Sequence, residues 1–204
     1  MTARPKTVEP FSVTLRNWLA TSKDLTLAGL IKVFNEKSFA LIFLLMLALP
    51  ALPIPTGGVT HVTEIIAALL SLQLIIGRKS VWLPKRFLKK DVGKFLGGKA
   101  AQKLIGVIEW FERWSRRRGS SVLANRVGLS GIGVLVLVFT VAAFVAPPFS
   151  GLDTLPALGV VVISLSLILE DIVMTLLGIV LACVGIGLEI AAGTALYSGL
   201  THFF

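Results

Sequence analysis

The distribution of positive charge constrains this chain more than any other feature of its sequence. All 20 lysines and arginines lie in two stretches, six within residues 1–38 and fourteen within residues 78–126. Residues 39–77 and 127–204 carry none. Membrane proteins concentrate basic residues in the loops that stay in the cytoplasm. The alternation therefore predicts two apolar blocks in a bilayer and two basic stretches, with the N-terminus, on its cytoplasmic side.

The composition supports the same class of protein. Hydrophobic residues make up 55% of the chain and charged residues only 15%, whereas soluble domains are about half apolar and about a quarter charged. The net charge of +9 does not indicate a nucleic-acid binder, because the basic residues lie between apolar blocks and not on a soluble fold. One cysteine excludes a disulfide framework, and the polar start argues against a cleaved signal peptide. We expect an all-α integral membrane protein.

Residues 1–38 are predicted to form a cytoplasmic arm followed by amphipathic helices. Thr26 is placed to cap a helix. Apolar side chains recur at helical spacing on both sides of it: Phe11, Leu15, Trp18, Leu19, Leu27, Leu30, Ile31 and Phe34. These helices either lie on the membrane surface or form a small cytoplasmic pair with its own core.

Residues 39–77 and 127–171 each predict a membrane hairpin broken by proline and glycine. Proline lacks a backbone donor, so the helix must be interrupted at each break. Three of the four arms are short or marginal against the roughly 20 residues that a spanning helix needs. Each hairpin could be two spanning helices with a tight outer turn, or a re-entrant loop whose tip is buried in protein. We favour re-entrance for the first. Residues 172–204 predict a last transmembrane helix and a tail.

Residues 78–126 carry fourteen basic side chains against three acidic ones. Apolar residues recur there every three or four positions, and Gly97-Gly98 is expected to divide the stretch into two amphipathic interfacial helices. Trp110 and Trp114 lie beside arginines, an arrangement that anchors a helix at the headgroup level. The candidate contacts for anionic lipid are Arg113, Arg116, Arg117 and Arg118. The alternative is a topology signal that binds no ligand.

An internal repeat relates the two apolar blocks. A shift of 93 residues aligns Ser71-Leu72 with Ser164-Leu165 and matches the breaks, so that Pro55 meets Pro148 and Gly58 meets Gly151. Paired Pro/Gly-interrupted segments mark the substrate site in repeat-built transporters. We therefore assign these four residues to a substrate or ion path. The same shift sets Arg78 opposite Asp171, which predicts an ion pair between the repeats made by Arg78 with Glu170 or Asp171.

Few ionisable side chains occur in the apolar blocks, and such groups at membrane depth suggest an ion, proton or substrate path. His61 and Glu64 lie three residues apart and can face the same way on a helix. They form a proton- or cation-responsive pair, or simply a hydrated helix N-terminus. Glu189 lies either deep in a glycine-lined helix contact or at a helix end.

Several sequence features resemble the ExoD-type exopolysaccharide synthesis family. They are Glu36-Lys37-Ser38-Phe39, Pro53-Ile54-Pro55, the run from Leu72 to Arg78, Trp82-Leu83-Pro84, Leu155-Pro156-Ala157 and Leu169-Glu170-Asp171. The similarity covers roughly residues 22–195. It implies a bacterial inner-membrane protein linked to exopolysaccharide production, with no established reaction.

No motif for phosphate binding, dinucleotide binding, zinc or a nucleophilic serine is present in the sequence. We therefore expect a non-enzymatic protein, without cofactor or metal, that transports or handles an anionic lipid-linked substrate for exopolysaccharide synthesis or export. One alternative is a small proton- or ion-coupled transporter that uses an intramembrane carboxylate. Another is a membrane scaffold for a polysaccharide synthase. The expected partners are the bilayer, its anionic lipid and the synthesis machinery, and a homo-oligomer is compatible with each function.

Overall fold

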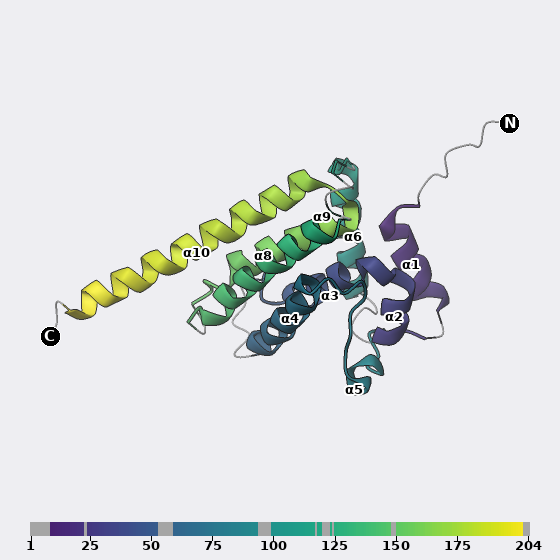
Figure 1. Cartoon of the computed structure of the whole chain (residues 1–204), viewed down its shortest axis with the longest axis horizontal. Coiled ribbons are helices and arrows are strands. Elements are labelled where there is room, and N and C mark those ends of the chain that lie inside the picture. The colour runs from purple at the N-terminus through teal and green to yellow at the C-terminus, as the bar shows by residue number, and fades with distance from the viewer. Residues whose placement is uncertain are drawn as a thin grey trace. The chain divides into compact units, whose positions relative to one another are not determined.

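The computed structural model describes residues 9–22, 24–52, 59–93, 99–116, 118–119, 123, 125–147 and 150–201. Every regular element among them is a helix, as predicted (Figure 1). The chain divides into two compact units. Unit 1 comprises Met1–Asn35 and Leu83–Arg116, and unit 2 comprises Glu36–Trp82 and Arg117–Phe204. The predicted segments 1–38 and 78–126 thus supply unit 1, and the apolar segments supply most of unit 2.

Unit 1 contains the helices α1 (Phe11–Thr21), α2 (Leu27–Phe34), α5 (Lys85–Leu88) and α6 (Lys99–Trp114). Thr26 caps α2 as predicted, because its side-chain oxygen accepts a hydrogen bond from the Gly29 amide at 3.2 Å. The apolar stripes of α1 and α2 pack inward, and the Trp18 ring meets the Phe34 ring edge-on at 5.9 Å. For these two helices the structure agrees with the small pair that has its own core.

The first of the two helices expected in residues 78–126 is much shorter than predicted. Helix α5 ends at Leu88, and residues 90–93 instead pair through their main chain with residues 25–27. The Leu27 amide donates to the Lys90 carbonyl, and the Val92 amide donates to the Leu25 carbonyl. The helix predicted from the apolar periodicity is therefore wrong for this segment, because its backbone forms hydrogen bonds with residues 25–27 in place of helical ones. Gly97-Gly98 lies outside the described residues.

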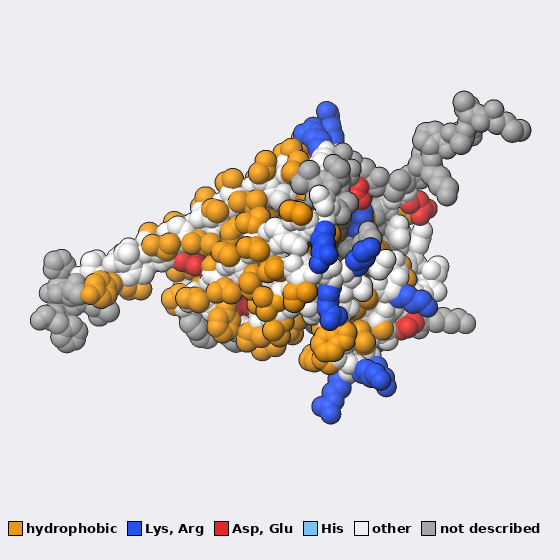
Figure 2. Space-filling model, viewed as in Figure 1, with side chains coloured by type: hydrophobic (Ala, Val, Ile, Leu, Met, Phe, Trp, Pro, Cys, Tyr) orange, Lys and Arg blue, Asp and Glu red, His pale blue; other side chains and the backbone are white. Residues whose placement is uncertain are grey.

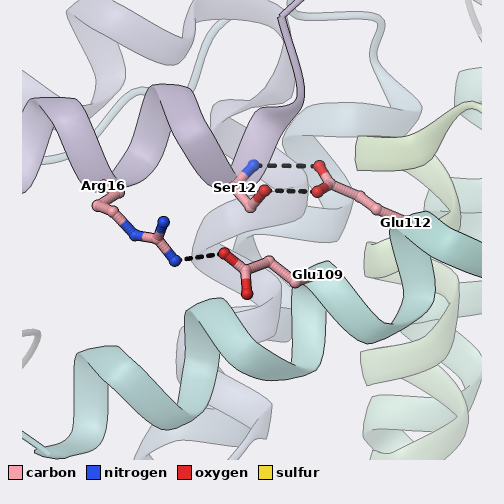
Figure 3. A network of polar contacts seen from close by, with 4 residues as sticks. All are labelled: Ser12, Arg16, Glu109 and Glu112. Carbon is pink, nitrogen blue, oxygen red and sulfur yellow. Dashed lines mark hydrogen bonds and ion pairs between the residues drawn. The ribbon is translucent and has the colours of Figure 1, made fainter.

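Helix α1 is capped from a distant part of the chain (Figure 3). Its N-cap residue is Pro10, which has no side-chain oxygen to offer the unpaired amides of the first turn. The Glu112 carboxylate of α6 supplies the missing acceptor, since both the amide and the hydroxyl of Ser12 donate to it. One turn further on, Arg16 pairs with Glu109. The acidic residues of α6 thus hold α1 in place.

Unit 2 contains α3 (Ser38–Leu47), α4 (Val59–Ile75), α8 (Arg126–Val145), α9 (Thr154–Leu169) and α10 (Ile172–Thr201). Helix α3 follows a short 3-10 turn, Asn35–Lys37, that begins at the unit boundary. Their order along the chain, α3, α4, α8, α9 and then the long α10, follows the apolar segments of the sequence.

The two hairpins exchange partners within unit 2. Helix α3 packs on α9, and α4 packs on α8. Helices α4 and α8 are antiparallel: the Ser130 hydroxyl donates to the Ile75 carbonyl at 3.0 Å, while the His61 and Phe144 rings meet at the other end. Since the Lys37 ammonium donates to the Ile168 carbonyl, α3 and α9 are also antiparallel. Both hairpins therefore open at the same end of unit 2. An internal repeat would produce this pairing of each helix with one from the other hairpin, but the repeat itself stays a prediction.

The two shortest apolar helices, α3 and α9, form the buried centre of unit 2, and eight of the ten α3 residues are buried. Glycines let α9 and α10 approach closely. A Cβ added to Gly159 or Gly178 would lie within 2.7 Å of the other glycine's carbonyl oxygen. Side chains of any size are therefore excluded at these two positions, as in closely packed membrane helices.

Among the described residues, two helices are long and apolar enough to cross a membrane, α8 and residues 172–198 of α10. Only 33% of an 18-residue apolar stretch of α8, and 28% of such a stretch of α10, is buried in the protein. Figure 2 shows hydrophobic side chains spread over the visible face of α8 and α10. Helix α10 runs back along α9 and continues well past the N-terminal end of α9 (Figure 1). Among the shorter helices, α4 exposes a further apolar face.

The glycine contact between α9 and α10 yields a paired test on a single helix. We expect Gly178→Ala to lower the free energy of unfolding by about 1–3 kcal/mol, because its Cβ would overlap the Gly159 carbonyl and Ile163. Gly187→Ala is the matched control, since its Cβ meets nothing within 4 Å. Unfolding of the purified protein in detergent measures both. Equal stabilities of the two variants would contradict the packing described here.

The remote cap of α1 predicts a difference between two neighbouring carboxylates. Glu112→Ala should destabilise α1 by about 1–2 kcal/mol, the usual cost of losing a helix cap. Glu109→Ala removes only an exposed ion pair and should cost less than about 1 kcal/mol. Hydrogen exchange of the α1 amides in the full chain distinguishes them. A larger loss of protection in Glu109→Ala would show that the ion pair, and not the cap, holds the helix.

Candidate functional site

A histidine and a carboxylate meet inside unit 2, near the start of α4. His61 Nδ1 lies 2.9 Å from Glu64 Oε2, one helical turn along. The Glu64 side chain is fully buried, whereas 27% of the His61 side chain remains exposed. The imidazole also packs edge-on against Phe144 of α8, with ring centroids 5.1 Å apart. The sequence correctly placed the two residues on one helix face, and their functional role stays a prediction.

A buried hydroxyl of α8 lies at about the level of this carboxylate. The contacts of Ile75 with Ser130 and of His61 with Phe144 fix the register of α4 and α8, which brings Glu64 level with Thr140. Both side chains are buried. Glu64 Oε1 and Thr140 Oγ1 have no hydrogen-bond partner among the described residues. The sequence analysis missed Thr140, although a hydroxyl in the buried stripe of an apolar helix was the available signal.

Two further carboxylates lie near this end of unit 2, Asp153 close to Glu64 and Glu189 close to Asp153. Asp153 lies in the turn just before α9, and its charge acts on both Glu64 and Glu189. Glu189 lies one turn beyond Gly185, which packs against Leu155 and Pro156 of α9. One of its oxygens is buried and, within the described part of the chain, has no hydrogen-bond partner. The helix-end alternative for Glu189 is wrong, because α10 continues to Thr201.

The predicted substrate or ion path is described only in part. Gly151 lies in the turn before Asp153 with a positive φ of 70°, which explains the glycine there. Pro55, Gly58 and Pro148 lie outside the described residues. Among the described residues, no group of three or more His, Cys, Asp or Glu side chains could hold a metal ion.

The opposite end of unit 2 carries basic residues and aromatic side chains. Lys37 Nζ lies 2.9 Å from a Glu170 carboxylate oxygen and also caps α9 through the Ile168 carbonyl. Glu170 has the left-handed backbone that ends this helix, with φ 59°. Asp171 Oδ1 accepts from the Val173 amide at the start of α10. The sequence did not predict the Lys37 pair, since nothing in a local pattern relates residues 37 and 170.

The Arg78 guanidinium lies over the Trp82 ring, 5.9 Å from its centroid. Its ion pair with Glu170 or Asp171 stays a prediction. Gln73 fixes this loop, because its amide group exchanges two hydrogen bonds with the Trp82 backbone, at 2.9 and 3.0 Å. The Trp82 ring itself is 61% exposed. An indole is thus held at the surface beside cations.

The predicted anionic-lipid contacts lie at the end of α6 and just beyond it. Trp110 and Trp114 are exposed, with ring centroids 6.2 Å apart, and Arg113 between them is exposed too. Arg116 and Arg118 are also exposed, and the Arg118 carbonyl accepts from the Ile172 amide of α10. Arg117 lies outside the described residues. Chemically, the carboxylate end of unit 2 suits protons or cations, and the arginines suit anions.

Comparisons of the sequence with known proteins identify a relative and a family. An uncharacterized protein of Synechocystis sp., slr1875, is 27% identical over 162 residues, which cover 76% of this chain and 72% of that protein. No solved structure matches the chain significantly.

The profile of the family described as "Exopolysaccharide synthesis, ExoD" matches residues 11–191, nearly the whole chain. The match spans all four helices of unit 1 and all but the end of unit 2. The family suggests a role related to exopolysaccharide synthesis. Together with the two helices of spanning length, it also suggests association with a membrane. The chain belongs to the ExoD family.

Proposed function

We propose that this protein is a multi-pass protein of the bacterial inner membrane that supports exopolysaccharide synthesis or export by transporting or handling an anionic, lipid-linked substrate. The observation that carries the proposal is the separation of surfaces in unit 2. Apolar side chains face outward along its helices, while the basic and aromatic residues gather at the end where both hairpins open. The proposed role is non-enzymatic.

The exposed apolar faces support insertion into a bilayer. A central helix of a soluble protein is mostly buried, whereas only 33% of an apolar stretch of α8 and 28% of one in α10 is buried in this chain. Exposed apolar side chains follow one another along α10, among them Leu176, Val180 and Val184. Water does not tolerate so continuous an apolar surface, but hydrocarbon does.

Helix lengths support a re-entrant first hairpin and a complete crossing by α10. The 10 residues of α3 extend only about 15 Å, half of a hydrocarbon core of about 30 Å. The 30 residues of α10 extend about 45 Å and cross it with some tilt. Lys37, Arg78 and Arg126 lie where the hairpins open, so the positive-inside rule supports a cytoplasmic position for that end and for the N-terminus.

The aromatic and basic side chains support contact with anionic headgroups. Tryptophan prefers the membrane–water interface, and each nearby lysine or arginine adds about 1 kcal/mol of attraction to an anionic surface. Trp82 with Arg78 in unit 2, and Trp110 and Trp114 with Arg113 in unit 1, meet this description separately. A phosphate-linked lipid carrier presents the same charge as an anionic phospholipid.

A second candidate function, proton- or ion-coupled transport, is favoured by the buried Glu64 and its contact with His61. This function requires the carboxyl group itself. A scaffold for a polysaccharide synthase would instead require only the exposed surface of residues 85–118 and would not need Glu64.

The proposed topology predicts which positions react from outside the cell. In a Cys183→Ala background, which removes the chain's one cysteine, Tyr197→Cys on exposed α10 should react with an impermeant maleimide in intact cells. Ser80→Cys, in the exposed loop after α4, should react only after the cells are opened. Labelling of Ser80→Cys in intact cells would overturn the proposed orientation.

The lipid-handling role predicts a specific effect of the arginine cluster. Changing Arg113, Arg116, Arg117 and Arg118 to Gln should reduce co-purified anionic lipid by well over tenfold, because four charges contribute about 1 kcal/mol each. Exopolysaccharide output should fall in a strain that depends on this copy. The matched control removes four charges from the α5 region, at Lys85, Arg86, Lys89 and Lys90. Equal losses in both variants would show bulk charge attraction and not a substrate site.

A further inference from the structure

We propose that Glu64 is an exchangeable proton-binding site inside unit 2, completed by His61 and Thr140 and reached from the end at which Asp153 and Glu189 lie. The inference deepens the second candidate function and rests on the proposed insertion of unit 2 into the bilayer. It names the ligand, the hydroxyl that receives it and the direction from which it arrives.

Burial supplies the first argument. The Glu64 side chain is fully buried, and only one of its two oxygens has a hydrogen-bond partner among the described residues. A charged carboxylate in apolar surroundings costs several kcal/mol unless both oxygens are satisfied. A proton on Oε1 removes that charge and creates a donor. The neutral histidine, in contrast, can satisfy only the other oxygen.

Thr140 supplies the second argument. Its hydroxyl oxygen is buried, has no partner in the described part of the chain, and lies on α8 at the level of Glu64. Two unsatisfied polar atoms on facing helices are rare in native interiors. The two atoms are not hydrogen-bonded to each other in the structure, so the proposed contact requires a side-chain rotation, after which a protonated Oε1 donates to the hydroxyl oxygen. No heavy-atom bond forms or breaks in this step.

The surroundings of Glu64 decide from which end the proton comes. Helix α4 packs on α3, which has no titratable side chain, and on α8, whose titratable side chain, Arg126, lies at its far end. The other titratable groups near Glu64 are His61 on its own helix and Asp153 before α9, with Glu189 of α10 next to Asp153. All three lie toward the start of α4. The opposite end presents lysine and arginine, which repel protons, and its carboxylates Glu170 and Asp171 already contact Lys37 and the Val173 amide.

The depth of the site fits this route. Glu64 lies about 16 Å along the helix axis from Ile75, at about half the thickness of a hydrocarbon core. His61, partly exposed, lies one turn closer to the carboxylate end. A proton from water at that end passes the Asp153 and Glu189 carboxylates, then reaches Glu64 Oε1 beside His61. Release reverses the same path.

Infrared difference spectra between acidic and alkaline pH test the site in the purified full chain. We expect a titrating band of a protonated carboxylic acid that is absent in Glu64→Gln and retained in Glu109→Gln, which removes an exposed carboxylate of unit 1. Glu64→Asp keeps the acid and should shift the band without abolishing it, so the assignment does not depend on the folding of Glu64→Gln. A band that persists in Glu64→Gln, or no band in the native protein, overturns the proposal.

The partner and the ligand are tested in the same spectra. Thr140→Val should shift the frequency of the acid band, because the hydroxyl acceptor is lost. Thr63→Val is the control, since its hydroxyl donates within α4 to the Thr60 carbonyl. An unshifted band in Thr140→Val removes Thr140 from the site. Replacing sodium by choline at constant pH should change nothing, and loss of the band in sodium would identify a metal cation as the ligand.

Rapid pH jumps test the direction of access. Asp153→Asn combined with Glu189→Gln should slow the appearance of the acid band about tenfold, because local negative charge raises the proton arrival rate. Glu170→Gln removes a carboxylate from the opposite end and should leave the rate unchanged. A slower rate in Glu170→Gln alone would reverse the proposed direction. Neither outcome depends on exopolysaccharide output or on the arginine cluster, so this inference and the lipid-handling role fail separately.

Discussion

The fold of unit 2 depends on the burial of α3, a helix of ten residues that are almost all apolar. The chain encloses it between α4 and α9, and eight of its ten residues are buried. In the bilayer setting that we propose, the hydrophobic effect gives no preference for helix contacts over lipid contacts, so close packing has to hold the helices together. The glycines of α9 and α10 provide this contact, since Gly159 and Gly178 leave room for backbone against backbone.

Because both hairpins open at the same end of unit 2, the basic residues that flank them lie together at that end. There, Lys37 caps α9, and the Arg126 guanidinium donates to the Ile76 carbonyl at the end of α4. Among the described residues, the acidic and histidine side chains toward the opposite end are His61, Glu64, Asp153 and Glu189. Lys37 and Arg126 thus stabilise helix ends, and His61 faces Glu64, which are conditions that favour polar groups near hydrocarbon.

The sequence predicted the features that depend on local order and composition. Apolar runs and their proline breaks gave the five helices of unit 2, Thr26 gave a helix cap, and the spacing of His61 and Glu64 gave a shared face. Contacts across long separations were not predictable. No local pattern shows that Glu112 caps a helix 100 residues earlier, or that Lys37 pairs with Glu170. The failed helix after Leu88 has the same cause, because residues 25–27 compete for its backbone. Thr140 became visible only when the register of α4 and α8 placed it opposite Glu64.

The two proposals assign opposite charges to opposite ends of unit 2, and electrostatics requires this division. An anionic headgroup brought near Asp153 and Glu189 would be repelled, and repulsion is strong where little water screens it. The same group near Arg78 and Trp82 meets a cation and an indole that Gln73 holds in place. A proton, in contrast, is attracted by Asp153 and Glu189 and repelled by Arg78. Helix α4 joins the two environments, since Glu64 lies near its start and Gln73 near its end. A single rigid helix therefore carries both the proposed proton site and the support of the proposed headgroup site.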